Sequence, residues 1–560
     1  MKARIRQWAS SSAAFALALT TTLSLLCSPA SAAAVDAAEG VIVNAPGFEV
    51  AGNTLLAPET IQARLAEFHS QPRNRQDREP DLPRLKAAAA AVQELYRRAG
   101  YGGVIAFLPE QTLKKDVVVR IRVVEGRLAH VEVKGNEHFS TANILASLPD
   151  LKPGETPRVR VIDEQIQLAN ESPVKTVQVL LQPGEGPGDI NAQVSVRERP
   201  TQQFHVRLDN TGNASTGRWR SSLGWMDGDL LGGDQILGLE LQLAPEHPSE
   251  LVVASVSYRA PLYTRSMALD AYAAWYDVSA GTTATAAGDL DFAGRGYILG
   301  TRLNYYLPRL GNVDQRLLLG LEDRVYDNSC SISGLPAGAC GSAGASVDVQ
   351  PLTVQYLGQS AGLVVQNWGL GLSVNLGFLG GNADAASVQT VRPGARQHYG
   401  IFRGHYAATY TFTNNTGQES LGSVSLRAAA QYTSDALIPG EQFGLGGAQS
   451  VRGYAEREVS GDRGLQGTLE YLSAALFPTA SAALAQLRAL AFSDAGWADN
   501  RLGTPCAIGR SRCQLASAGA GLRYAYQDFQ ARLDWGHALR AGSLTRRGDN
   551  RIHVALSLAI

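Results

Sequence analysis

From Thr201 to its last residue, the chain alternates between apolar and polar side chains in one short segment after another. Phe204, Val206 and Leu208 share one face of the first such segment, and charged or polar residues occupy the positions between them. The same two-residue period returns in residues 237–243, 529–535 and 552–560. A period of two indicates strands with two unlike faces. A soluble sandwich does not normally keep Arg, Asp and Glu on its inner side, so we predict a transmembrane β-barrel.

The number of alternating segments predicts the size of this barrel. We count about sixteen strands in residues 200–560, and an even number is expected for a bacterial barrel of one chain. With both barrel ends in the periplasm, each connection from an odd to an even strand is extracellular. The 58 glycines and the scarcity of cysteine and methionine also fit an outer-membrane barrel. Beyond the amino terminus there is no apolar run long enough for a membrane-spanning helix.

Residues 1–32 have the pattern of a secretory signal peptide. Lys2, Arg4 and Arg6 supply its positive charge, an apolar segment follows, and Ala30-Ser31-Ala32 forms a small-residue cleavage site. We place cleavage after Ala32 and interpret residues 33–47 as a short lead or linker. The net charge of −1 argues against nucleic acid as a partner.

Four cysteines remain after the signal peptide, and they form two pairs that are local in sequence: Cys330 with Cys340, and Cys506 with Cys513. In an exported protein this spacing predicts two disulfide bonds. A zinc site is the alternative, but neither pair has a histidine within it. The strand count places the pairs between strands 7 and 8 and between strands 13 and 14, on the extracellular side, where disulfides persist.

The segment before the barrel contains the same order of elements twice. Residues 48–127 read as strand, helix, helix, strand, strand, and residues 128–199 repeat that order. Gly100 lies where a left-handed cap would end the second helix of the first copy. We therefore predict two small α+β domains in series, followed by the barrel over 200–560.

The longest connection of the barrel, at about 435–464, contains several glycines and the sequence Val451-Arg452-Gly453-Tyr454. Some forty residues later, a predicted strand contains Phe492, Asp494 and Gly496. A guanidinium in a partly wet lumen favours a carboxylate that it can contact with two nitrogens. The two motifs therefore predict an ion pair between Arg452 and Asp494, which either gates the pore or only braces the barrel wall.

These two motifs resemble the signature of the outer-membrane superfamily of polypeptide transporters and barrel insertases, in which the loop between strands 11 and 12 folds into the lumen. The tandem domains resemble POTRA domains. The first is similar to that of the two-partner secretion transporters, the TpsB family of haemolysin and filamentous-haemagglutinin exporters. The residues that carry this likeness are Gly100, Tyr101, Pro109, Glu110, Gln111, Glu125 and Gly126.

The resemblance implies an outer-membrane transporter with periplasmic POTRA domains in a Gram-negative bacterium. Its implied partners are a secreted exoprotein with an N-terminal secretion domain, outer-membrane lipid, and the barrel-assembly machinery during biogenesis. The exoprotein would be recognised by the POTRA domains and exported unfolded without ATP. The alternative is an assembly factor that inserts other barrels. Many family members carry a helix that plugs the barrel, and because only residues 33–47 precede the first POTRA domain, we expect a full plug to be missing or shortened.

No pattern in the sequence supports an enzyme, a cofactor site or a metal site. The histidines are scattered, and no nucleophile, base and acid occur at catalytic spacing. Asp227, Asp229 and Asp234 lack the spacing of a calcium loop, so we interpret them as a polar periplasmic turn. The sequence leaves open which exoprotein is exported, how the pore is closed, and the oligomeric state.

Overall fold

The computed structural model describes residues 41–45, 47–69, 82–112, 118–213, 216–285, 288–332, 341–414, 420–503 and 511–560. The predicted signal peptide, Cys340 and Cys506 lie outside these ranges. Within them, no helix combines the length and the apolar character needed to cross a membrane. The chain divides into two compact units. One holds the residues up to Arg97 with Val104–Glu125, and the other holds Arg98–Gly103 with Gly126–Ile560.

The first unit is a four-stranded sheet with two helices. Its elements are β1 (Val41–Ala45), β2 (Phe48–Asn53), α2 (Pro58–His69), α3 (Leu82–Arg98), β3 (Val104–Phe107) and β4 (Val119–Glu125). The order in the sheet is β1-β2-β4-β3, with β2 parallel to β4. Val50, Ile61, Leu65, Val92 and Ile121 are fully buried between sheet and helices.

Strand β1 lies within residues 33–47, which we predicted to be a lead or linker. Its residues Val41-Ile42-Val43 are β-branched, and such residues favour strands. It pairs antiparallel with β2, so that the backbone groups along this side of β2 are hydrogen-bonded. The end of the predicted linker is therefore part of the first sheet.

The second α+β domain opens the other unit. It contains β5 (Arg127–Lys134), α4 (Thr141–Ala146), α5 (Val159–Ala169), β6 (Lys175–Pro183) and β7 (Asp189–Glu198), with sheet order β5-β7-β6. Ser140 caps α4 by accepting a hydrogen bond from the backbone N–H of Asn143. The core of this domain includes Leu128, Ile144, Ile162, Val177 and Val194. The same order of elements thus appears twice, as the sequence predicts.

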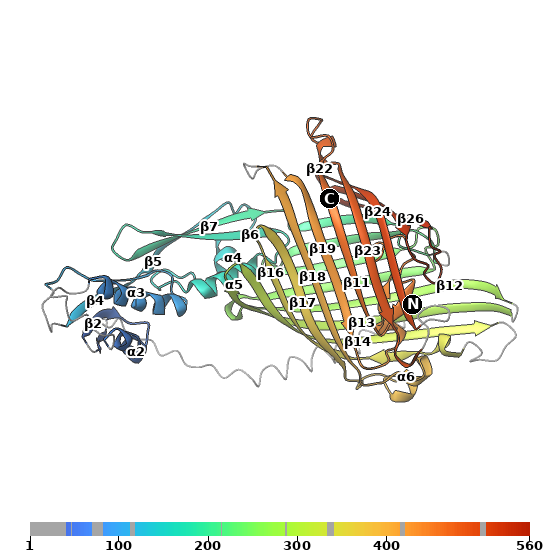
Figure 1. The fold of residues 1–560 in the computed structure, drawn as a ribbon, viewed down its shortest axis with the longest axis horizontal. Coiled ribbons are helices and arrows are strands. Elements are labelled where there is room, and N and C mark those ends of the chain that lie inside the picture. The colour runs from blue at the N-terminus through green and yellow to red at the C-terminus, as the bar shows by residue number, and fades with distance from the viewer. Residues whose placement is uncertain are drawn as a thin grey trace. The chain divides into compact units, whose positions relative to one another are not determined.

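The remainder of this unit is a closed antiparallel barrel (Figure 1). Its strands are β8 (Gln202–Asp209), β9 (Arg220–Leu230), β10 (Gln235–Leu243), β11 (Leu251–Leu262), β12 (Met267–Thr285), β13 (Gly288–Leu310), β14 (Val313–Ile332), β15 (Val347–Val349) with β16 (Pro351–Ser360), β17 (Val364–Asn375), β18 (Gly400–Thr413), β19 (Ser420–Tyr432), β22 (Arg463–Ala475), β23 (Arg488–Asp499), β24 (Arg512–Tyr526), β25 (Phe529–Ala538) and β26 (Asn550–Ala559).

The strand count confirms the predicted barrel size. Strands β15 and β16 both pair with β14 and are separated only by Gln350, so they form one interrupted strand. Counted in this way, the barrel has sixteen strands. Short elements in the connections are α6 (Ala385–Val391) and the 3₁₀ turns η1 (Tyr263–Arg265), η2 (Gly341–Gly344), η3 (Pro439–Glu441), η4 (Leu484–Gln486) and η5 (Arg501–Gly503).

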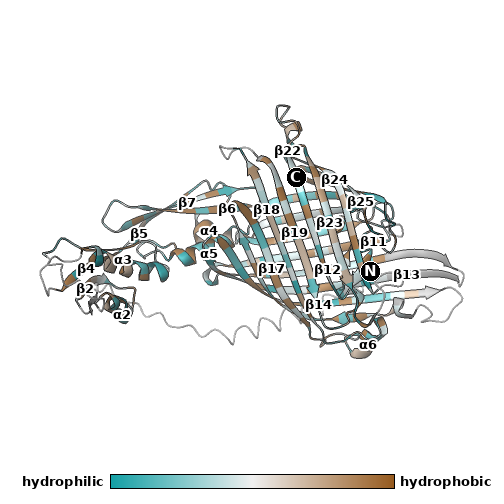
Figure 2. Ribbon diagram, in the orientation of Figure 1, coloured by the Kyte–Doolittle hydropathy of each residue, from teal (hydrophilic) through white to brown (hydrophobic). Residues whose placement is uncertain are grey.

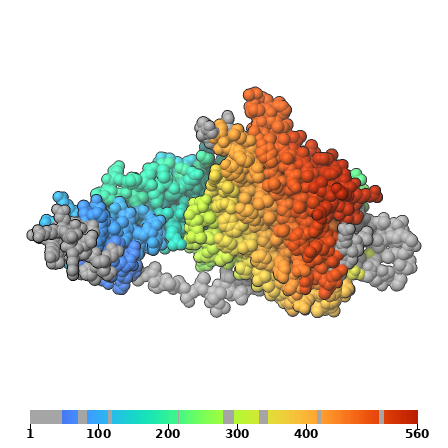
Figure 3. All heavy atoms as spheres, viewed as in Figure 1, coloured from blue at the N-terminus to red at the C-terminus, as the bar shows by residue number. Residues whose placement is uncertain are grey.

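The two faces of the barrel wall differ in polarity along each strand. Apolar and polar colours alternate along the barrel strands in Figure 2. Phe204, Val206, Leu239, Leu533 and Trp535 are large apolar residues that are exposed on the outside. The wall is continuous in the space-filling view from the yellow strands to the red ones (Figure 3). This exposed apolar surface is what a barrel surrounded by lipid requires.

The barrel closes where its first strand, β8, meets its last strand, β26. The ladder between these strands has five residue pairs, from Ala555↔Asp209 to Ala559↔His205, and the backbones of Phe204 and Ile560 add one more, whereas nine pairs join β25 to β26. The side chain of Asn210 extends the closure, because its amide donates to the carbonyl of Ile552 and accepts from the N–H of Val554, both at 2.8 Å. These side-chain bonds add to the backbone hydrogen bond from the N–H of Asn210 to the carbonyl oxygen of Val554 at 3.2 Å.

Candidate functional site

The connection between the eleventh and twelfth barrel strands, β19 and β22, folds into the barrel and is here called the lumen loop (residues 433–462). Its two limbs pair through the short strands β20 (Phe443–Leu445) and β21 (Val459–Gly461). The base of the loop is closed by Asp462, which is fully buried and accepts a hydrogen bond from the N–H of Leu437 at 2.9 Å. Between these limbs lies the tip, with Arg452.

The structure brings Arg452 and Asp494 together. The Arg452 side chain donates from Nε and from one terminal nitrogen to the two carboxylate oxygens of Asp494, each at 2.8 Å, and its backbone N–H donates to the same carboxylate at 3.0 Å. Both side chains are almost completely buried, with exposed fractions of 3% and 0%. A pair with this geometry has the strong, two-point hydrogen bonding of a guanidinium with a carboxylate.

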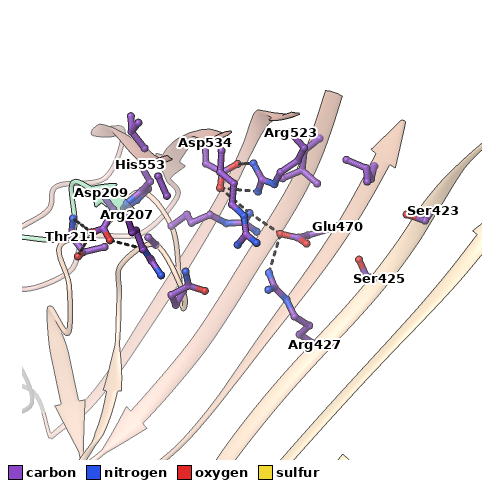
Figure 4. A pocket seen from close by; sticks show the side chains of 18 of the residues that line it. Arg207, Asp209, Thr211, Ser423, Ser425, Arg427, Glu470, Arg523, Asp534 and His553 are labelled. Atoms are coloured by element: carbon purple, nitrogen blue, oxygen red, sulfur yellow. Dashed lines mark hydrogen bonds and ion pairs between the residues drawn. The ribbon is translucent and has the colours of Figure 1, made fainter. Parts of the chain in front are cut away.

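Two further carboxylates reach the same guanidinium. Glu470 on β22 lies 2.7 Å from the remaining terminal nitrogen of Arg452, and Asp534 on β25 lies 3.6 Å from it. Each of these acids also has a second arginine, Arg427 for Glu470 and Arg523 for Asp534. Figure 4 shows the four side chains of Glu470, Asp534, Arg427 and Arg523 turned toward one another. Together with Arg452 and Asp494, the cluster balances three arginines against three carboxylates.

An aromatic ring completes the surroundings of the guanidinium. The central carbon of the Arg452 guanidinium lies 3.4 Å from the centre of the Phe492 ring, which is a cation–π contact. Phe492 is two residues before Asp494 on β23, and so both point into the barrel from the same face of one strand. The spacing of Phe492 and Asp494 in the sequence is therefore the spacing that one strand face needs.

The residues next to Arg452 fix the backbone of the tip against the wall. Gly453 has a φ of 91°, and a side chain there would be 3.1 Å from the backbone of Gly536 on β25. Its N–H donates to Nε2 of His553 at 3.1 Å. The hydroxyl of Tyr454 lies 2.8 Å from the carbonyl oxygen of Ala516 and 2.7 Å from that of Arg540. Val451 is also fully buried in this cluster.

Gly496, on β23, lies against the lumen loop at a second place. A side chain at Gly496 would come within 2.8 Å of Leu445 on the loop strand β20. The lumen loop thus lies directly against β23, and glycine at this position leaves room for the Leu445 side chain. Arg452 also lines a cavity of about 360 Å³, together with Arg207, Asp209 and His553, which Figure 4 labels. Thr409 and Arg532 are further residues of this lining.

The sequence did not predict three further carboxylates that hold the lumen loop. Glu441 is paired with Arg324 on β14 and with Arg403 on β18. Asp462 receives both terminal nitrogens of Arg392, from the segment after α6. Glu458 accepts from the backbone N–H groups of Leu544 and Thr545 at 3.0 and 2.8 Å. Acidic residues within the predicted lumen loop could have indicated these contacts, but the sequence does not specify which arginines or N–H groups they bind.

The residues of the predicted POTRA signature are structural. Gly100 has a φ of 97° directly after α3, and Tyr101 forms a β-bridge with Arg158. Gln111 donates to the carbonyl oxygen of Arg120 and accepts from its N–H, and so its side chain extends the edge of β4. Pro109 and Glu110 follow β3 without regular structure. Gly126 approaches the carbonyl oxygen of Gly103, where a side chain would not fit.

Glu125 clamps the turn that follows β2. Its carboxylate accepts hydrogen bonds from the N–H groups of Thr54 and Leu55 at 2.7 and 3.0 Å. It also accepts from the hydroxyl of Tyr96 at 2.9 Å. This residue therefore holds strand, turn and helix of the first domain together.

The second domain is joined to the periplasmic turns of the barrel by ion pairs. Lys175, at the start of β6, lies 2.5 Å from Asp234 in the turn between β9 and β10, and both side chains are buried. Burial lowers the pKa of Lys175, and the attraction of Asp234 opposes this shift. Glu171 lies 2.9 Å from Arg316 on β14, and Glu164 accepts from Ser266 at 2.9 Å. The predicted polar turn at Asp234 is thus also part of a joint.

In the described part of the chain, no group of three or more His, Cys, Asp or Glu is placed to hold a metal ion. The two predicted disulfide bonds stay predictions, because Cys340 and Cys506 lie outside the described residues. Cys330 is near the end of β14, the seventh strand, and Cys513 is near the start of β24, the fourteenth. Both positions border the connections that the sequence assigned to them.

Comparison with protein families gives two matches. The model of haemolysin secretion/activation proteins ShlB/FhaC/HecB matches residues 188–524, and the model of the ShlB-type POTRA domain matches residues 44–126. The outer membrane transporter CdiB of Escherichia coli is 25% identical over 507 residues, covering 86% of this chain and 77% of that protein. The heme/hemopexin transporter protein HuxB of Haemophilus influenzae is 26% identical over 207 residues, covering 36% of this chain and 34% of that protein.

Solved structures share the fold. CdiB from Escherichia coli superposes with a TM-score of 0.74 at 20% identity, covering 96% of this chain and 93% of that one. CdiB from Acinetobacter baumannii gives a TM-score of 0.71 at 17% identity, covering 95% of this chain and 93% of that one. At such identities the superpositions show a common architecture of POTRA-type domains and barrel.

Proposed function

The chain belongs to the haemolysin secretion/activation family ShlB/FhaC/HecB of outer-membrane transporters, and from this premise we propose that it exports one partner exoprotein through its barrel. The exoprotein would have an N-terminal secretion domain, be recognised in the periplasm by the POTRA domains, and cross the barrel unfolded. The observation that carries the proposal is the inward-folded loop, which fills part of the lumen of a closed barrel and is held there by side-chain ion pairs. Such contacts can be exchanged without breaking the strand ladder.

The POTRA sheets supply a physical means of recognition. The order β5-β7-β6 leaves one side of β6 unpaired within the described sheet. An unpaired strand edge offers N–H and C=O groups to an extended chain, which can add to the sheet as a further strand. Leu180 on β6 is exposed and would contact side chains of that added strand. We infer that an extended exoprotein segment is bound in this way.

In this proposal the free energy for export does not come from ATP hydrolysis but from folding of the exoprotein. The exoprotein would enter unfolded and fold outside the cell, and folding there prevents the exported segment from returning. The ion pairs of the second domain with the barrel turns keep the bound segment near the periplasmic mouth. We also propose that residues 48–127 and 128–199 act as separate POTRA domains and that the two cysteine pairs form extracellular disulfide bonds. The alternative of a barrel insertase is not carried forward, because the matching family is that of secretion proteins.

The test compares culture supernatants and outer membranes from cells with the wild-type protein, a deletion, and Arg452→Ala. We expect the deletion to remove one large protein from the supernatant while other outer-membrane barrels keep their levels. We expect Arg452→Ala to leave Asp494 buried without a cation, which costs about 3–5 kcal/mol for a buried pair, and so to reduce the amount of folded barrel. An unchanged supernatant with depleted outer-membrane barrels would instead identify an insertase.

A further inference from the structure

We propose that Glu441 is the releasable anchor of the lumen loop: its ion pairs with Arg324 and Arg403 break when the pore opens, while the tip at Arg452 stays bound to the wall. The pore and its opening rest on the proposed export function. The inference goes beyond that function because it assigns the closed state to a residue outside the Arg452 motif. It also separates two roles, a permanent tip anchor and a releasable anchor, that the sequence left undecided for Arg452.

The lumen loop is bonded to opposite sides of the barrel. Glu441 pairs with Arg324 on β14, which is the seventh strand. Arg452 approaches Asp534 on β25, which is the fifteenth strand. Positions seven and fifteen are half a circumference apart in a ring of sixteen strands. The other partners, Arg403 and Asp494, lie on the tenth and thirteenth strands. The loop and the side chains that hold it therefore occupy part of the lumen, and we expect the passage for a protein chain to widen when one of the two ends is released.

The contacts of the tip are the harder ones to release. Arg452 and Gly453 donate backbone N–H groups to Asp494 and His553, and Gly453 packs directly on the backbone of Gly536. Among the described residues, Asp494 has no ion pair other than that with Arg452. Release of the tip would thus leave a buried carboxylate without a cation and several buried backbone groups without partners, which is strongly unfavourable.

The contacts of Glu441 are made mainly by its side chain; its backbone carbonyl accepts one hydrogen bond, from the side-chain amide of Gln431, which also donates to the carbonyl oxygen of Asp462. The Glu441 side chain is 1% exposed and is held by two arginine side chains. When Glu441 leaves, Arg324 keeps Glu322, whose carboxylate lies 2.5 Å away on the same strand. The side chain of Arg403 is 38% exposed and can be hydrated. Release at this end therefore leaves neither arginine buried and unpaired, and the separated state is accessible.

The base of the loop supplies the point about which it can turn. Asp462 joins the two limbs through the N–H of Leu437 and is itself held by Arg392 and by the N–H of Arg501 at 2.7 Å. Glu441 lies four positions beyond Leu437, within the 3₁₀ turn η3. Movement of η3 away from β14 and β18 would thus require neither the base nor the tip to dissociate.

The experiment is a planar-bilayer recording on the purified full-length protein without any exoprotein, so that its result does not depend on what the protein exports. We expect Glu441→Gln to raise the fraction of time in the open state by about tenfold or more, since losing the charge of a buried ion pair is sufficient for a shift of this size. Glu456→Gln is the matched control: Glu456 is in the same loop, and its carboxylate accepts from the N–H of Ala448 within that loop. We expect Glu456→Gln to behave as the wild type.

A structural role alone would appear as loss of folded barrel, so heat-modifiable migration in gels is measured on the same samples. The proposal requires that Glu441→Gln keeps the folded migration while the open fraction rises, and that Arg452→Ala chiefly lowers the folded fraction. If Glu441→Gln does not fold, Arg403→Gln replaces it, because the Arg324 pair then remains, and a rise of about threefold is expected. A folded Glu441→Gln, or in its place Arg403→Gln, with wild-type openings overturns the proposal.

Discussion

The two α+β domains share one set of contacts, here called the clamp, made by a glycine at the end of one strand and a glutamate at the end of another. They differ in the residue that lies opposite this glutamate. In each domain a glycine in the left-handed region lies at the end of the strand that precedes the first helix: Gly52 in β2 with a φ of 92°, and Gly135 directly after β5 with a φ of 84°. Each glycine packs on a carbonyl oxygen of the last strand, and an added side-chain carbon would lie 2.2 Å from that of Val123 or 2.4 Å from that of Val196. The two domains therefore need glycine for the same reason.

The last strand of each domain ends in a carboxylate that holds the turn after this glycine. Glu125 does so in the first domain, and Glu198 accepts from the N–H groups of residues 137, 138 and 139 in the second, at 3.1, 2.7 and 3.1 Å. Asn53 and Asn136 also correspond, because the side-chain amide of each donates a hydrogen bond of 2.9 Å to the carbonyl oxygen three residues later. The same set of contacts, made by the same residue types, therefore occurs in both domains.

The two domains differ in the residue that lies opposite this glutamate on the neighbouring strand. Val104 is the strand neighbour of Glu125, and Lys175 is the strand neighbour of Glu198. Valine is the usual occupant of a buried sheet position, whereas a buried lysine needs a partner. Lys175 finds it in Asp234 of the barrel and also lies 4.8 Å from the centre of the Phe139 ring. The contacts of the glycine and the glutamate thus belong to the domain fold, and the lysine belongs to the joint with the barrel.

We expect the largest effect from Lys175→Val, which gives the second domain the valine that the first domain has at the corresponding position, Val104. Asp234 then stays buried without its cation, and we expect a loss of about 3–5 kcal/mol in the unfolding free energy of the second domain and its joint. Urea titration of the purified full-length protein in detergent measures this loss. Lys152→Val, at an exposed lysine of the same domain, is the control. Equal stability of the two variants would mean that Lys175 does not serve the joint.

The shared glycines should respond alike. Gly52→Ala and Gly135→Ala each force a side chain onto a backbone oxygen, so each should cost more than the about 1–2 kcal/mol that a left-handed conformation alone imposes. Gly154→Ala is a matched control, because Gly154 has a φ of 88° but no atom within 4 Å of the added carbon. The same urea titration compares the three. If Gly135→Ala were no worse than Gly154→Ala, the backbone contact in the clamp would be unimportant.

The smallest expected effect depends on pH. Burial alone would raise the pKa of Glu198, but the backbone N–H groups of residues 137–139 outweigh it, and the pKa lies below the usual 4.5. The stabilisation is therefore complete above pH 4.5 and is lost as the pH falls through the lowered value. We expect Glu198→Gln to cost about 1 kcal/mol at pH 7 and to flatten this dependence, as measured by urea titrations from pH 7 to pH 3. Glu137→Gln, at an exposed neighbour, should keep the wild-type slope.

The sequence predicted the parts of the fold that have a short period or a local signal. The two-residue alternation was sufficient for the barrel, since each apolar face meets lipid along the whole strand. The pair of Arg452 and Asp494 was predictable because both lie in motifs with a known resemblance. The strand β1 was missed, because Val41–Ala45 is short and gains its partner only from the edge of β2.

The remaining contacts depend on distances in sequence that no local pattern records. Lys175 and Asp234 are 59 positions apart, and Arg324 and Glu441 are 117 apart. Charged residues occur on many lumen-facing positions, so the sequence offers several partners for Glu441, and only the strand order and register select two of them. For the same reason Asp234 was interpreted as a turn residue, without its role in the joint.

The closure of the barrel at Asn210 has a consequence for the order in which the protein folds. Asn210 and Ile552 are separated by 342 residues, and closing a flexible chain segment of that length costs about 5 kcal/mol of entropy. The connections between the other neighbouring strands are far shorter, the longest being the lumen loop of residues 433–462, so these strand pairs form at lower entropic cost. The seam is therefore the last contact to become favourable, after the other hairpins have brought β8 and β26 together. Until then both terminal strands have open edges, and the chain is most prone to aggregate at that stage.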